Sequence, residues 1–296
     1  CAWGDYDNDG DIDLYIVYTS GLNALYRNNA PSGTFTNIAS AAGVGGATGS
    51  PSDSDAAWGD FDLDGDLDLM LLYESSGASL RSHQLFRNNG NSTFTDVATS
   101  AGVGFQKYGE HCKWADYDND GYPDLYLVNL QGLSDQLLHN NRNGTFTDVT
   151  SLAGIVEDFH CWNALWADVN DDGLQDIFCS SVTGTPGQNF RLWINAGNGA
   201  FIDVSASSGV QTTSCTGFGG AITALDKDND GDIDLYVGCD NNDRLLENNA
   251  ADPPAFTDVA MTSGVDESIF PRSAYGVGAA DIGNDYDQDV LVTGTE

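Results

Sequence analysis

Short stretches of alternating apolar and polar residues recur along the chain, separated by turns rich in glycine and asparagine. One set ends in asparagine and covers residues 25–29, 85–89, 137–141, 192–195 and 245–249. A second set begins with phenylalanine and covers residues 35–38, 94–97, 146–149, 201–204 and 256–259. Alternation with a period of two predicts half-buried strands, and the Asn/Gly turns between the two sets predict hairpins. No segment shows a sustained 3.6-residue period, so an all-β protein is expected.

Two further strands are predicted in each unit, on either side of an acidic loop. The strand before the loop holds small and aromatic residues, with tryptophan two residues ahead of the loop at Trp3, Trp58, Trp114 and Trp166. Ala224 and Ala279 take its place in the last two units. Four short antiparallel strands in about 50 residues are typical of a β-propeller blade. The Trp and Phe stripes are then expected to pack between neighbouring blades rather than to bind a ligand.

The acidic loops set the repeat, because they begin at residues 5, 60, 116, 168, 226 and 281. Their spacing of about 55 residues predicts an array of similar units. We expect a single β-propeller over residues 1–296, with five complete repeats and half of a sixth blade. The approximate repeats are 1–55, 56–111, 112–163, 164–221, 222–276 and the partial 277–296.

Each loop has the pattern D-x-[DN]-x-D-G-x-x-D, and its nine residues are numbered here as positions one to nine. Ca²⁺ takes six to eight oxygen ligands, and a tight turn of alternating acids can surround it. Glycine at position six permits the sharp turn, and position seven would contribute a main-chain carbonyl. An acidic solvated turn would explain one such loop, but five loops in register favour calcium.

The predicted Ca²⁺ ligands occupy positions one, three, five, seven and nine of five loops. They are Asp5, Asp7, Asp9, Asp11 and Asp13; Asp60, Asp62, Asp64, Asp66 and Asp68; Asp116, Asp118, Asp120, Tyr122 and Asp124; Asp168, Asn170, Asp172, Leu174 and Asp176; and Asp226, Asp228, Asp230, Asp232 and Asp234. About five ions per chain are therefore expected. The sixth loop, residues 281–289, has Gly283 at position three and Tyr286 at position six, so weak or no calcium binding is expected there.

The acidic composition limits the possible partners. The chain has 45 Asp and Glu against 10 Lys and Arg, a formal charge of −35. Such a surface repels nucleic-acid backbones and anionic membranes. The sequence contains no run of eighteen apolar residues, so no membrane-spanning helix is predicted. The first residue, Cys1, falls in the middle of the repeat pattern, which suggests a portion of a longer precursor.

Six cysteines and the calcium loops favour an oxidising, extracellular setting, either secreted or at a cell surface. A disulfide between Cys112 and Cys161 is expected, with a soft-metal site that adds His111 and His160 as the alternative. Cys179, Cys215 and Cys239 could supply a second bridge. Asn91 and Asn143 begin N-glycosylation sequons.

The texture AWGDYDNDGDIDLY, LYRNN, GTFT-[ND]-[IV]-A and AGV resembles the FG-GAP (VCBS-type) repeats of integrin alpha-chain propellers. It is still more similar to the cartilage acidic protein and ASPIC/UnbV group. The resemblance spans the whole chain. It implies a propeller, usually seven-bladed, with Ca²⁺ held in the loops between first and second strands.

No catalytic motif is evident, so the chain is not expected to be an enzyme. Carboxylates outside the loops, such as Asp55, Glu110, Glu157, Asp158 and Asp243, are expected to be solvated. We predict an extracellular calcium-binding scaffold for protein or glycan recognition or adhesion, with structural Ca²⁺. Two alternatives remain: a fibre or sheath subunit completed by strand exchange, as a homo-oligomer or filament, and a calcium-dependent polysaccharide lyase or hydrolase. An unliganded acid beside a Lys, Arg or Tyr in a cleft would indicate the enzyme.

Overall fold

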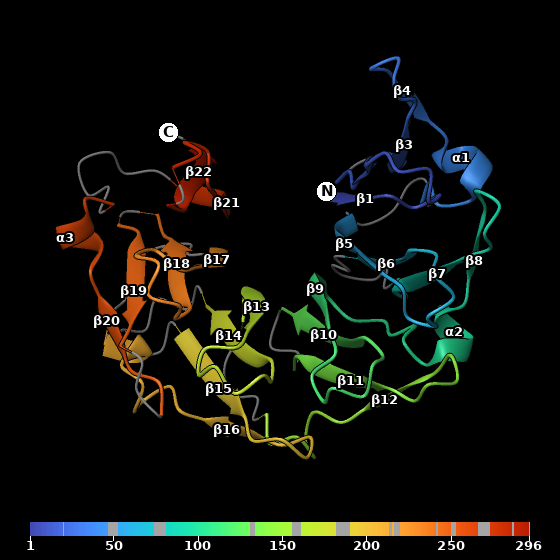
Figure 1. Ribbon diagram of the computed structural model, residues 1–296. Coiled ribbons are helices and arrows are strands. Elements are labelled where there is room, and N and C mark those ends of the chain that lie inside the picture. Colours follow the sequence, from blue (N-terminus) through green and yellow to red (C-terminus); the bar gives the residue numbers. More distant parts are fainter. Residues whose placement is uncertain are drawn as a thin grey trace. The chain divides into compact units, whose positions relative to one another are not determined.

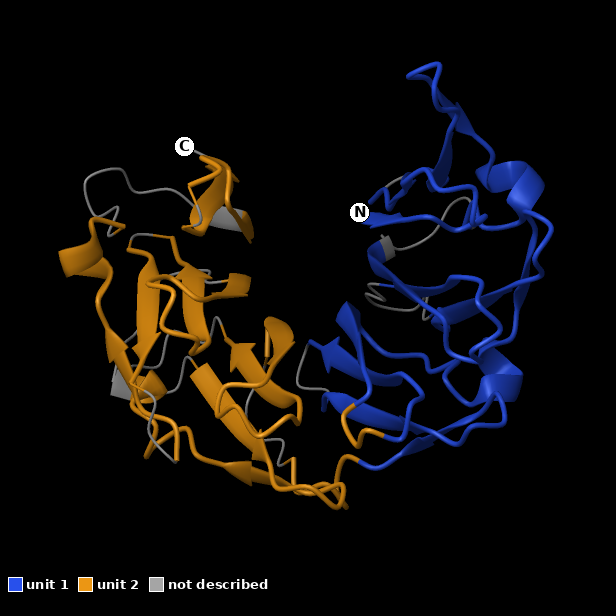
Figure 2. Cartoon of the chain, viewed as in Figure 1, with its two compact units in different colours: residues 1–116, 120–149 blue, residues 117–119, 150–296 orange. Residues whose placement is uncertain are grey.

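The computed structural model describes residues 1–19, 21–46, 53–73, 81–130, 134–155, 161–181, 190–212, 215, 220–240, 242–249, 253–265, 273–285 and 287–295. These residues fall into two compact units (Figure 2). The first unit comprises residues 1–116 and 120–149, and the second comprises residues 117–119 and 150–296. Each unit is built from antiparallel sheets of consecutive strands, as the sequence predicts (Figure 1).

Three four-stranded sheets form the first unit, and each follows chain order. The first sheet contains β1 (Ala2–Gly4), β2 (Asp13–Ile16), β3 (Ala24–Asn28) and β4 (Phe35–Asn37). The second contains β5 (Asp53–Gly59), β6 (Asp68–Tyr73), β7 (Gln84–Asn88) and β8 (Phe94–Asp96). The third contains β9 (Gly109–Ala115), β10 (Asp124–Asn129), β11 (Gln136–Asn140) and β12 (Phe146–Asp148).

The second unit contains two four-stranded sheets and one two-stranded sheet. The first of these contains β13 (Asn163–Ala167), β14 (Asp176–Ser180), β15 (Phe190–Asn195) and β16 (Phe201–Asp203). The second contains β17 (Ala221–Leu225), β18 (Asp234–Gly238), β19 (Arg244–Asn248) and β20 (Phe256–Asp258). The half blade pairs β21 (Ser273–Ala280) with β22 (Asp289–Thr295), from Ser273 opposite Thr295 to Ala280 opposite Asp289.

Short helical turns close several repeats, a detail that the sequence reading did not include. They are α1 (Ala39–Ala42), α2 (Ala98–Ala101), α3 (Ala260–Ser263) and the 3₁₀ turn η1 (Val210–Thr212). The first three begin where an Asn or Asp side chain accepts the N–H two residues ahead, as Asp96 does from Ala98 at 3.0 Å. Each ends at a left-handed glycine, such as Gly102 with φ 79°. The Asp-Val-Ala and Ala-Gly-Val motifs are therefore the start and stop signals of one helical turn.

Within each compact unit, hydrophobic core clusters lie between successive sheets. The strand β6 is buried along its whole length. Its Leu69 and Leu71 pack with the first repeat, whereas Met70 and Leu72 pack with the third. Strands buried on both faces stabilise a stack of sheets.

Tryptophan contributes to this packing, as predicted. Trp58 stacks on Tyr6 of the preceding repeat, with ring centroids 6.1 Å apart and planes at 16°. Trp166 stacks in the same way on Tyr117, at 6.4 Å and 8°. Trp3, in the first repeat, is 60% exposed.

Candidate metal centre

The acidic loops share one backbone conformation. The residue at position four has a φ between 54° and 58° in all six loops: Asn8, Leu63, Asn119, Asp171, Asn229 and Asn284. Glycine at position six also has positive φ, for example 92° at Gly10 and 93° at Gly65. No described atom lies within 4 Å of where a Cβ would stand on these two glycines. Glycine is therefore required by backbone conformation and not by crowding.

The carboxylate at position one closes the turn. Asp5 accepts hydrogen bonds from the main-chain N–H groups of Asp9 at 3.1 Å and Gly10 at 3.0 Å. The corresponding pairs are present at Asp60, Asp116, Asp168 and Asp226. The carboxylate at position five accepts the N–H of position seven, as Asp9 does from Asp11 at 3.0 Å. Each loop is thus held by its own aspartates.

The carboxylate at position nine is buried and fixed by two main-chain donors. In the second loop, Asp68 accepts from Phe61 N–H at 3.1 Å and from Asn88 N–H at 2.8 Å. Asp13, Asp124, Asp176 and Asp234 are also buried. Burial is the largest influence on three of these carboxyl groups, and it raises the pKa of Asp68 and of Asp176 to about 7 and that of Asp13 to about 6.

The side chain at position three carries an unsatisfied oxygen. The Oδ1 atoms of Asp7, Asp62 and Asn170 are buried and accept no hydrogen bond from any described residue. A buried acceptor without a donor is costly, so it indicates a missing partner. In the first loop the carboxylates of Asp5, Asp7 and Asp13 bring one oxygen each within 4.8 Å of one another, and Asp60, Asp62 and Asp68 do the same in the second. An all-oxygen donor set of this kind fits a hard cation such as Ca²⁺.

The remaining loops differ in detail. In the third loop, Asp118 belongs to the second compact unit, whereas Asp116, Asp120, Tyr122 and Asp124 belong to the first. In the sixth loop Asp281 still accepts the N–H of Asp285 at 3.0 Å, but Gly283 offers no side-chain oxygen. Tyr286 lies outside the described residues.

The main-chain carbonyls at position seven, from Asp11, Asp66, Tyr122, Leu174 and Asp232, stay a prediction. Asp172 and Asp230 receive the N–H of Leu174 and Asp232 as the other position-five carboxylates do. The fourth loop keeps this arrangement although Asn170 replaces an aspartate.

An asparagine in the third strand completes each site, and the sequence reading did not give it a role. The main-chain N–H of Asn88 donates to Asp68, and its side-chain amide donates to the carbonyls of Leu67 at 3.1 Å and Tyr6 at 2.8 Å. Asn140, Asn195 and Asn248 repeat all three bonds. The recurrence of asparagine at this position was the available signal.

Asp55 and Asp243 were expected to be solvated, but this expectation is wrong, because the side chain of Asp55 is only 18% exposed, Asp243 is 1% exposed, and both hold structural contacts. Asp55 accepts from the N–H of Cys112 at 3.2 Å and lies 3.3 Å from His111 Nδ1. Asp243 accepts from the N–H of Cys239 at 2.9 Å and from the hydroxyl of Tyr236. Glu157, Asp158 and His160 lie outside the described residues.

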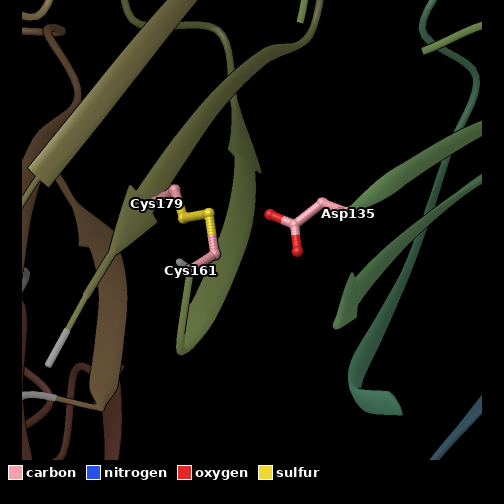
Figure 3. Close-up of side chains that lie close together, drawn as sticks. All are labelled: Asp135, Cys161 and Cys179. Carbon is pink, nitrogen blue, oxygen red and sulfur yellow. A yellow bond between two sulfur atoms is a disulfide. The ribbon is translucent and has the colours of Figure 1, made fainter. Parts of the chain in front are cut away.

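Each disulfide joins the segments at the first and second strands of one sheet, which corrects the prediction of a Cys112–Cys161 bridge. Disulfides join Cys161 to Cys179 (Figure 3) and Cys215 to Cys239, with Cα atoms 5.8 and 5.5 Å apart. Cys161 lies just before β13 and Cys179 lies in the adjacent strand β14, which brings their Cα atoms within bridging range. Cys1 and Cys112 are free. Because Cys161 is bonded to Cys179, the alternative soft-metal site that included it is also wrong.

Surface features include two sequons and one cavity. Asn91 and Asn143 are exposed in the turns that follow β7 and β11. A cavity of about 240 Å³ in the second repeat is lined by Tyr73, Arg81, His83, Gln84 and Asp96 among others. Among the described residues, no helix is long and apolar enough to cross a membrane.

Comparison with known proteins identifies relatives of similar repeat structure. Cartilage acidic protein 1 of Mus musculus is 25% identical over 322 residues, covering 97% of this chain and 47% of that protein. The same protein of Xenopus tropicalis is 28% identical over 163 residues, covering 52% of this chain and 24% of its own length. The chain thus spans about half the length of the mouse protein it matches.

A solved structure with a similar fold is that of an Agrocybe aegerita lectin that specifically recognises non-reducing terminal N-acetylglucosamine. It has a TM-score of 0.60 and 17% identity, over 98% of this chain and 73% of the lectin. The model of the FG-GAP-like repeat matches residues 5–71, 76–127, 116–179 and 168–237. The sheets, the loops and these matches together place the chain in the family of FG-GAP-like repeat proteins.

Proposed function

We propose that this chain is an extracellular, calcium-stabilised FG-GAP scaffold that recognises a protein or glycan partner and has no catalytic activity. The observation that carries the calcium part is the unsatisfied Oδ1 of Asp7, Asp62 and Asn170, buried beside the carboxylates at positions one and nine. Buried oxygens are normally paired, so an oxygen that receives no hydrogen bond from the protein is suited to bind a cation such as Ca²⁺.

Calcium would be held by side-chain oxygens of positions one, three, five and nine, with a main-chain carbonyl at position seven. When bound, it supplies positive charge that offsets repulsion among clustered carboxylates. An ion that binds only the folded chain adds free energy of unfolding of about 2.7 kcal/mol per site at about 100 Kd. With several loops, this gain is large compared with the net stability of a typical domain.

Recognition of a partner is supported by the comparisons and by a cavity in the second repeat. The matched lectin binds a sugar, and the matched relatives are named as a cartilage protein. A rigid sheet scaffold commonly carries its binding residues on connecting loops. The cavity lined by Arg81, Gln84 and Asp96 offers charged and amide groups suited to a small polar ligand such as a sugar. Two disulfides and exposed sequons are in keeping with a secreted or cell-surface protein.

The test is calcium stoichiometry together with thermal melting, in EDTA and in millimolar Ca²⁺. We expect about five ions per chain and a large rise in the melting temperature. Two matched variants, Asp64→Ala and Asp285→Ala, remove the position-five carboxylate and its turn bond from the second and sixth loops. Only Asp64→Ala should lose one ion and part of the calcium-dependent rise. Equal melting in EDTA and Ca²⁺, with no bound ions, would refute the proposal.

A further inference from the structure

The fifth loop differs from the others at position two. This position holds Tyr6, Phe61, Tyr117 and Val169 in the first four loops and Lys227 in the fifth. Tyr6 and Tyr117 stack on the tryptophan of the following repeat. The sixth repeat has Ala279 where that tryptophan would stand. The fourth loop also precedes an alanine, Ala224, and keeps the apolar Val169, so the absence of the tryptophan permits a polar side chain at position two but does not require one.

The ammonium group of Lys227 contacts the next residue of its own loop. Its Nζ lies 2.7 Å from Oδ2 of Asp228 and 3.0 Å from Oε2 of Glu247 in β19. The side chain of Lys227 is 16% exposed and that of Asp228 is 44% exposed, so this ion pair is shielded from solvent on the lysine side only. Asp228 is position three, the position whose oxygen is unsatisfied in the first, second and fourth loops. In the fifth loop that carboxylate already has a cationic partner.

We propose that Lys227 competes with calcium for Asp228 and makes the fifth loop a weak calcium site, which fills late and empties early. The third loop has a comparable contact, since Arg142 Nε lies 2.6 Å from Oδ2 of Asp120, so its affinity is expected to be lowered as well. The inference rests on the proposed calcium binding. An incoming ion must either displace the ammonium group from Asp228 or share this carboxylate with it, through the oxygen Oδ1 that the ammonium group does not contact. In both cases a positive charge stays close to the ion and opposes its binding.

Glu247 keeps this site usable. It holds the same ammonium group at 3.0 Å, so Lys227 can release Asp228 and stay paired with Glu247. In the corresponding position of the third strand, the first two repeats have Arg27 and Arg87. The fifth loop therefore has two arrangements of one cation between two carboxylates, and calcium favours the one that leaves Asp228 free.

The test is a calcium titration by calorimetry of the chain and of Lys227→Met, which keeps the length of the side chain and removes its charge. We expect the ion of the fifth loop to bind about tenfold more weakly than the tightest ions of the wild type. Lys227→Met should raise the affinity of that ion about tenfold and leave the total number of ions unchanged. Glu247→Gln should weaken it further, because Lys227 then has only Asp228 as its partner.

Two controls assign the effect to this loop. Lys107→Met makes the same charge change in the first unit, where the ammonium group donates to the carbonyl of Ser134, and should alter no affinity class. Asp226→Ala should remove the weak ion, whereas Asp5→Ala should remove a tight one, with circular dichroism used to confirm folding.

A single affinity class in the wild type, or a weak class that Lys227→Met leaves unchanged, would overturn the inference while the proposed calcium scaffold stands. Absence of calcium binding in every variant would instead refute the scaffold itself. The two failures are thus distinguishable in one set of titrations.

Discussion

The side-chain amide of Asn88 donates a hydrogen bond to the main-chain carbonyl of Tyr6 at 2.8 Å, although the two residues are 82 positions apart. The same asparagine holds Asp68 at position nine of its own loop through its main-chain N–H. One residue therefore links the acidic loop of one repeat to that of the repeat before it. Asn140 to Phe61, Asn195 to Tyr117 and Asn248 to Val169 repeat this bond.

Replacement of Asn88 by alanine should destabilise the chain by about 2 kcal/mol, because buried carbonyls lose their donor. Asn28 provides the matched control. Within the described residues, its amide donates to Ile12 in its own loop at 3.2 Å and to no preceding repeat. Asn28→Ala should therefore cost clearly less than Asn88→Ala in urea unfolding at a fixed calcium concentration. Equal costs would mean that the bond between repeats contributes little.

Leu63 occupies the left-handed position of the second loop, with φ 58°, where other loops have asparagine or aspartate. A left-handed backbone costs a residue with a Cβ roughly 1–2 kcal/mol, and asparagine tolerates it best among such residues. Leu63 is 47% exposed, so little packing is lost on substitution. Leu63→Asn should raise the free energy of unfolding by about 1 kcal/mol.

The equivalent asparagine of the first loop shows what else the substitution offers. Asn8 donates to the carbonyl of Gly65 in the next loop at 3.0 Å. Leu63→Ala is the control, since alanine keeps the Cβ and gains no donor, and it should not stabilise the chain. Denaturant unfolding of the two variants measures the difference, and stabilisation by both would rule out the asparagine as the cause.

The repeating features were predictable from sequence because each recurs four or five times. Comparison of the repeats separates the positions that they share from those that vary. The shared positions predicted the strand order, the acidic loop and the packing of Trp58. Single events were not predictable. The Cys161–Cys179 bridge depends on the separation of two strands in space. The effect of Lys227 depends on its contacts with Asp228 and Glu247 in the folded chain. Asn88 was predictable in part. The recurrence of asparagine at this position is visible in the sequence, but its acceptor, the carbonyl of Tyr6, lies in another repeat and could not be identified.

The two disulfides leave two free cysteines and so predict which thiols can be labelled. Cys1 is exposed, whereas Cys112 is buried, and burial raises the pKa of its thiol well above the usual value. Since the thiolate is the reactive form, an alkylating reagent should modify Cys1 quickly and Cys112 only after denaturation. Peptide mapping should then find Cys161 joined to Cys179 and Cys215 joined to Cys239. Labelling of Cys179 in the unreduced protein would contradict this assignment.

His83 should make the chain sensitive to acid. Its side chain is 1% exposed, and burial, with a further contribution from the charge of Lys107, lowers the pKa of its imidazole to about 4. The unfolded chain protonates this group near pH 6.5. Between pH 6.5 and 4 the unfolded state therefore binds a proton that the folded state does not, and the free energy of unfolding falls as the pH is lowered. The total loss is about 3 kcal/mol, from 1.36 kcal/mol for each pKa unit.

The variant that isolates this effect is His83→Asn, because Asn23 fills the corresponding place in the first repeat. Asn23 Oδ1 accepts the N–H of Tyr18 at 3.0 Å, as His83 Nδ1 accepts that of Tyr73 at 3.3 Å. Asparagine keeps the acceptor and does not titrate, although its smaller side chain should cost about 1 kcal/mol at pH 7. We expect the variant to be the less stable protein at pH 7 and the more stable one at pH 4.5. Urea unfolding of both proteins in EDTA across this range measures the difference between them, in which the titration of the carboxylates cancels. A difference that stays constant with pH would show that His83 is not the titrating group.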